Sequence, residues 1–84
     1  MRSCRTQQLR FALTEKGAQV TIRVYDVSGR LVRVVENAKR APGNYAVTWD
    51  GKDSTGRRVA AGVYLSQIRA GNQAETQLVV LLAD

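Results

Sequence analysis

Short stretches of alternating apolar and polar residues run through the chain, separated by clusters of turn-forming residues. In the clearest stretch, residues 18–26, Val20, Ile22 and Val24 alternate with polar or aromatic neighbours. Alternation with a period of two, carried by β-branched side chains, is typical of a strand that buries one face. We therefore predict six strands, over residues 9–13, 18–26, 30–36, 45–50, 62–68 and 75–82.

The connections between these segments carry turn chemistry. Asp26, Ser28 and Gly29 predict a tight turn after the second segment, and residues 37–44 read as a loop. Segment 30–36 has apolar residues of both parities, which indicates a bulge or burial on both faces. Residues 31–40 also fit one helix, but their three valines favour a strand. The series predicts an all-β, immunoglobulin- or fibronectin-III-like antiparallel β-sandwich of six to seven strands.

Length and composition describe one folded domain. The 84 residues have room for a single core, and 44% hydrophobic with 24% charged residues are ordinary globular values. Cys4 is the one cysteine, so an internal disulfide is excluded. We expect residues 1–8 to be a flexible N-terminal segment or linker remnant, and residues 9–84 to be the sandwich domain.

Location depends on whether the chain is complete. No apolar run approaches the roughly 20 residues that a membrane-spanning helix needs, so no membrane insertion is expected. The first ten residues lack the apolar stretch of a signal peptide. We expect a cytoplasmic protein if the 84 residues are the whole protein. We expect an extracellular or cell-surface location if they belong to a longer exported chain.

The stretch from Trp49 to Tyr64 holds the candidate chemistry. A calcium loop starting at Asp50 would place Lys52 and Ala61 where oxygen ligands are required. A phosphate-binding loop requires Lys after its second glycine, where this chain has Arg57. Asp and Gly in such numbers favour a structured connection between strands. We predict that seven residues are structural, with aromatic rings in the core, carboxylates tying turns and glycines on tight backbone paths: Trp49, Asp50, Gly51, Asp53, Gly56, Gly62 and Tyr64.

No catalytic constellation is visible, so we expect no enzyme, cofactor, metal or small-molecule substrate. Histidine, the commonest general base and zinc ligand, is absent. Thirteen Lys and Arg against seven Asp and Glu give a net charge of +6, but these basic residues are scattered. They favour a solvated surface over specific nucleic-acid binding, although a small basic nucleic-acid-binding protein remains the alternative. A third reading makes Trp49 and Tyr64 a sugar-stacking platform.

The last predicted strand is apolar on both faces. Leu78, Val80 and Leu82 share one parity, and Val79 and Leu81 share the other. One face of a strand in a two-layer sandwich normally meets solvent, so a strand apolar on both faces needs a second cover. Either it lies in mid-sheet beneath a loop such as residues 37–44, or it packs on another chain or domain. The predicted candidate interface is Leu78, Val79, Val80 and Leu81, for docking on protein or for self-association.

Three stretches together carry a family resemblance. They are "VTIRVYDVSGRLVRVV" (20–35), "PGNYAVTWDGKDSTGRRVAAGVYLSQI" (42–68) and "TQLVVLL" (76–82). They resemble the immunoglobulin-like domain of the flagellar hook-capping family (FlgD Ig-like), and are similar to the C-terminal sorting domain of type IX secreted bacterial proteins. The resemblance implies a non-catalytic accessory module of a larger exported or cell-surface protein. Such a module would act in secretion, anchoring or assembly, with parent-chain domains or secretion machinery as partners.

Overall fold

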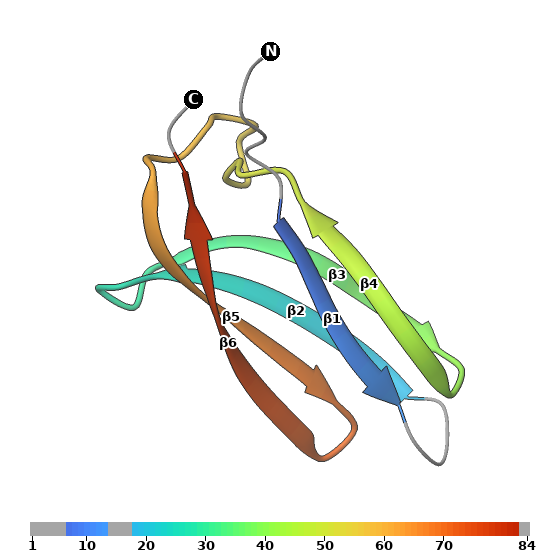
Figure 1. The fold of residues 1–84 in the computed structure, drawn as a ribbon. Helices are drawn as coiled ribbons and strands as arrows, with labels where there is room; N and C mark the ends of the chain where they lie inside the picture. The colour runs from blue at the N-terminus through green and yellow to red at the C-terminus, as the bar shows by residue number, and fades with distance from the viewer. Residues whose placement is uncertain (1–6, 14–17, 83–84) are drawn as a thin grey trace.

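The computed structural model describes residues 7–13 and 18–82, and these residues form two antiparallel sheets without any helix (Figure 1). Within these ranges, therefore, nothing helical is long and apolar enough to cross a membrane. The strands of the described residues are β1 (Gln7–Leu13), β2 (Ala18–Asp26), β3 (Leu31–Arg40), β4 (Gly43–Trp49), β5 (Gly62–Ala70) and β6 (Gln73–Leu81). The predicted all-β class is confirmed.

The two sheets differ in size. β1 and β4 form a two-stranded sheet, and the four-stranded sheet has the order β3-β2-β5-β6. Figure 1 shows the β1–β4 pair crossing over the longer, curved sheet. The side chains between the sheets form the core, as the predicted sandwich requires. The start of β1, the end of β6 and the loop over residues 50–61 lie at the same end of the molecule.

The core follows the alternation in the sequence. In β2 the buried side chains are Val20, Ile22 and Val24, each fully excluded from solvent, while the residues between them are more exposed. A one-residue slip of this strand would expose all three, so the pattern fixes which face turns inward. The strands β1, β4, β5 and β6 also contribute buried side chains to the core. β3 contributes only partly buried ones, Val32 and Val35. The fully assembled core is Leu9, Phe11, Leu13, Val20, Ile22, Val24, Trp49, Tyr64, Ile68, Val79 and Leu81.

The β2–β3 pair contains the predicted irregularity and corrects a predicted loop. The register shifts between Ile22 and Arg23 and again between Val24 and Tyr25, which explains the apolar residues of both parities in β3. The loop predicted over residues 37–44 is wrong, because β3 continues to Arg40 and β4 begins at Gly43. β3 is this long because its partner strand β2 begins at Ala18, and Ala18 pairs with Arg40.

The last strand lies at an edge, which corrects the mid-sheet alternative. β6 is hydrogen-bonded to β5 on one side and has no sheet neighbour on the other among the described residues. The expected flexible segment over residues 1–8 falls mainly on residues 1–6, which lie outside the described residues, as does Cys4. Gln7 and Gln8 belong to β1.

Candidate docking surface

The loop between β4 and β5 is fastened to the core by an aromatic ring at each end. Trp49 is 1% exposed, packs edge-on against Tyr64 at 5.4 Å between ring centroids, and donates from Nε1 to the carbonyl of Lys52 at 3.0 Å. The hydroxyl of buried Tyr64 donates to the carbonyl of Ala60 at 2.6 Å. Because both rings are buried, the exposed sugar-stacking platform considered from the sequence is excluded.

Asp53 organises the middle of this loop. Its Oδ1 accepts hydrogen bonds from the backbone N–H of Thr55 at 2.9 Å, the Thr55 hydroxyl at 2.7 Å and the backbone N–H of Arg57 at 3.1 Å. The Thr55 hydroxyl, then the Arg57 N–H, lowers the pKa of the Asp53 carboxyl. Gly56 follows with a φ of 90°, a conformation that favours glycine. The carboxylate of Asp53 therefore serves to stabilise the turn.

A second turn repeats the same geometry at the end of β2. Oδ1 of Asp26 accepts from the Ser28 N–H at 3.0 Å, the Ser28 hydroxyl at 2.7 Å and the Arg30 N–H at 3.0 Å. The Ser28 hydroxyl is the main cause that lowers the pKa of the Asp26 carboxyl. Gly29 has a φ of 93°. The two turn sequences, "DVSGR" and "DSTGR", share the pattern Asp-x-Ser/Thr-Gly-Arg, which is the signal in the sequence for their common geometry.

The remaining loop residues also have local backbone roles. Oδ1 of Asp50 accepts from the Lys52 N–H at 3.1 Å and lies 3.9 Å from Nη1 of Arg33. Gly51 is buried with a φ of 76°, and Gly62 begins β5. Among the described residues, no group of three or more metal-binding side chains comes together. The hydrogen bonds of this loop thus hold the conformation of a structural connection between β4 and β5.

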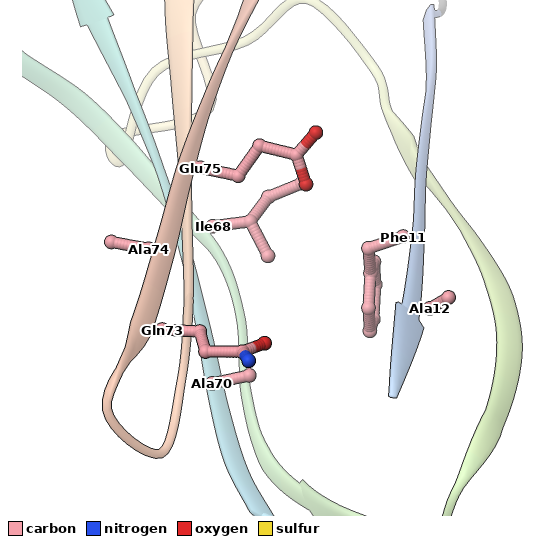
Figure 2. Close-up of a pocket in the computed structure, with 7 residues that line it drawn as sticks. All are labelled: Phe11, Ala12, Ile68, Ala70, Gln73, Ala74 and Glu75. Carbon is pink, nitrogen blue, oxygen red and sulfur yellow. The ribbon is translucent and has the colours of Figure 1, made fainter. Parts of the chain in front are cut away.

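A cavity of about 350 Å³ opens between β1 and the β5–β6 hairpin, and Figure 2 shows its lining. Phe11 and Ile68 face each other across it, and Glu75 and Gln73 stand on the hairpin side. Glu75 is the single carboxylate among the described residues that line it. One carboxylate without a partnering acid, base or nucleophile does not make an acid–base or nucleophilic centre.

One exposed apolar surface lies on β5, on β6 and on the residue that follows β6, while the other exposed large apolar residues lie on β3 and in the turn before it: Val27, Leu31 and Val34. Leu78 is 67% exposed and Leu82 60%, and Val80 and Val63 are also exposed. Val63 pairs directly with Val80, so the two share the outer face of the sheet. The predicted interface needs correction at Val79 and Leu81. Both are buried, because the strand alternation turns them into the core. The exposed residues of the candidate docking surface are Val63, Leu78, Val80 and Leu82.

Comparison with known proteins points to one family. The family model described as "FlgD Ig-like domain" matches residues 3–74. The "Basal-body rod modification protein FlgD" of Salmonella typhimurium is 39% identical over 67 residues, covering 80% of this chain and 28% of the relative. The protein of the same name from Salmonella typhi matches to the same extent. The crystal structure of FlgD from P. aeruginosa matches with a TM-score of 0.71 and 28% identity, covering 87% of this chain and 55% of that chain.

Proposed function

The chain belongs to the FlgD Ig-like domain family, and on that premise we propose that it is a non-catalytic module of a larger exported bacterial protein, working through protein–protein contacts. The chain spans about 28% of the length of the curated relatives it matches. A domain that is one part of such relatives would act with the rest of its polypeptide and with other assembly proteins. The parent protein would work in flagellar assembly, outside the cytoplasm.

The observation that carries this proposal is the exposed apolar surface on β5 and β6. Monomeric soluble proteins rarely expose large contiguous apolar patches, and such patches often mark interaction sites. The loop over residues 50–61 supports a non-catalytic module, since the carboxylates of Asp50 and Asp53 accept hydrogen bonds from backbone N–H groups of the loop. A sorting or anchoring role in type IX secretion would use the same fold, but the matched relatives are FlgD proteins.

The nucleic-acid alternative has no support in the comparisons. The matched relatives are named for basal-body rod modification. The described residues form no helix that could enter the major groove of DNA as a recognition helix. A protein partner therefore takes precedence.

A domain exchange tests the proposal. The region of Salmonella typhimurium FlgD that matches this chain is replaced by this domain, in a strain without its own FlgD. We expect the chimera to support flagella, counted by electron microscopy, and swimming. Its matched control is the same chimera with Trp49→Ala, which removes the largest buried side chain. The proposal is overturned if the folded, stably produced chimera supports no more flagella than the strain without FlgD.

A further inference from the structure

The outer face of the four-stranded sheet is divided into an apolar end and a cationic end. One row of paired residues crosses all four strands: Leu31 with Tyr25 between β3 and β2, Tyr25 with Leu65 between β2 and β5, and Leu65 with Leu78 between β5 and β6. Directly paired residues share a face and touch. The whole row is therefore apolar or aromatic, and the pair Val63–Val80 extends it along β5 and β6.

The other end of the same face carries positive charge. Arg23 pairs with Val34 and Gln67, and Arg69 pairs with Thr21 and Ala74. Lys39 pairs with exposed Gln19 at the far end of β3. These three cations have the outward parity, since the buried residues of β2 and β5 are those that alternate with them.

Carboxylates are excluded from this face among the described residues. The three acidic residues on the sheet, Asp26, Glu36 and Glu75, pair directly with core residues. Their partners are Tyr64, Ile22 and Ile68, all buried. The acidic positions thus have core-side parity and lie at the ends or edges of the inner layer. Within the described ranges, the outward face thus combines apolar side chains with positive charge and carries no carboxylate.

From this layout we infer that the outer face of the four-stranded sheet binds a protein surface that presents apolar side chains flanked by carboxylates. The inference rests on the proposed function and names the chemistry of the partner. Apolar burial would supply the adhesion, and the carboxylates would meet Arg23, Lys39 and Arg69. Complementary charge of this kind gives an interface its orientation and speeds association.

A second copy of this chain fits the face less well. It would cover the apolar row with the same row, but within residues 7–13 and 18–82 it brings only cations and no carboxylate to the cationic end. Full overlap of two faces would therefore oppose like charges, which is unfavourable in an interface. With a net charge of +6, two copies also repel each other at a distance. An acidic partner uses both ends of the face.

The test is a titration of the isotope-labelled domain with synthetic amphipathic helices, followed by amide chemical shifts and fluorescence anisotropy. The first peptide carries a leucine stripe flanked by glutamates, the second the same stripe flanked by lysines, and the third glutamates with serines in place of leucines. We expect the leucine–glutamate peptide to bind at least about tenfold more tightly than either of the others. The shift changes should centre on Tyr25, Leu65 and Leu78.

Two pairs of substitutions on the outer face, with one control pair in the loop over residues 50–61, check that this face is responsible. Arg23→Glu with Arg69→Glu should weaken binding of the leucine–glutamate peptide by about tenfold or more, since attraction becomes repulsion. The control pair Arg57→Glu with Arg58→Glu changes the net charge equally in the loop and should weaken it far less. Leu78→Ser with Val80→Ser should weaken binding while the domain stays folded, with only a modest fall in melting temperature from the two cross-strand contacts that are lost.

Other outcomes overturn the inference in distinguishable ways. Equal binding of the lysine peptide would remove the charge argument, and equal binding of the serine peptide would remove the apolar one. If no peptide binds and sedimentation shows a dimer that Leu78→Ser dissociates, the occupant of the face is a second copy of this chain. A monomer that binds no peptide would refute docking on this face altogether. In both cases the domain exchange, measured in cells, still decides the proposed function separately.

Discussion

Replacing Trp49 by alanine is the most severe single change that the structure predicts for this domain. The side chain is the largest of those fully buried. Truncating a buried Trp or Phe to Ala typically costs about 3–5 kcal/mol. The edge-on contact with Tyr64 and the hydrogen bond to Lys52 disappear at the same time. At roughly 0.05–0.15 kcal/mol per residue, 84 residues give a total stability of about 4–13 kcal/mol. The variant should therefore lose between about a quarter and all of the parent's stability.

Urea unfolding followed by far-ultraviolet circular dichroism measures this cost. Trp49→Phe is the matched control, because it keeps an aromatic ring in the core while removing the Nε1 donor. A net hydrogen bond is worth about 0.5–1.5 kcal/mol, so the control should lose only that and the volume difference. The difference in unfolding free energy between the two variants then measures the contribution of the packed ring. The difference between Trp49→Phe and the parent measures mainly the hydrogen bond to the Lys52 carbonyl.

The reasoning is refuted if Trp49→Ala unfolds within about 1 kcal/mol of the parent, since no buried ring of this size is removed so cheaply. It is also refuted in part if Trp49→Phe is as destabilised as Trp49→Ala. That result would assign the stability to the hydrogen bond and not to the packed ring.

Three further expectations concern the two aspartate turns, a buried serine and metal removal. Hydrogen bonds lower the pKa of the Asp26 and Asp53 carboxyls, so their contribution is full above the unfolded pKa near 3.8 and is lost as pH falls through the folded pKa. Unfolding free energies measured from about pH 6 to about pH 2 should therefore fall less steeply in Asp26→Asn with Asp53→Asn than in the parent, and equal slopes would contradict this. Ser66 is fully buried and its Oγ has no hydrogen-bond partner in the described part of the chain, so Ser66→Ala should leave the melting temperature unchanged or raise stability by up to about 1 kcal/mol; a marked loss would reveal a partner for the hydroxyl. Since metal-binding side chains do not cluster in residues 7–13 and 18–82, a chelator should leave the melting temperature unchanged, and a drop of several degrees would show a structural metal.

The strands were predictable because their signal is local. Alternation in residues 18–26 identifies both the strand and its buried face, and the structure has a strand of that length in that orientation. The error over residues 37–44 arose because Asn37 and Lys39 are polar and resemble loop residues. A non-local argument would have corrected it, since a strand that begins at Ala18 needs a partner reaching Arg40 after the turn at Ser28 and Gly29.

The faces of β6 show where local reading stops. The sequence shows apolar residues of both parities but not which parity faces the core. The choice is made by β5, whose buried Tyr64 pairs with Val79 and thereby turns Val79 inward and Leu78 outward. The charge division of the outer face is likewise invisible in the sequence. Arg23, Lys39 and Arg69 are far apart along the chain and meet on one face only through strand pairing.

The pairing of β1 with β4 has a consequence for the order of folding. These strands are joined at the register Leu13–Gly43, while the entire β2–β3 hairpin between them belongs to the opposite sheet. A hairpin closed by a tight turn forms from local contacts, whereas joining β1 to β4 requires closing the chain around it, at an entropic cost that rises with loop length. The smaller sheet should therefore form late, after β2 and β3 have paired, and proteins dominated by such non-local pairings fold on the slow, millisecond-to-second scale.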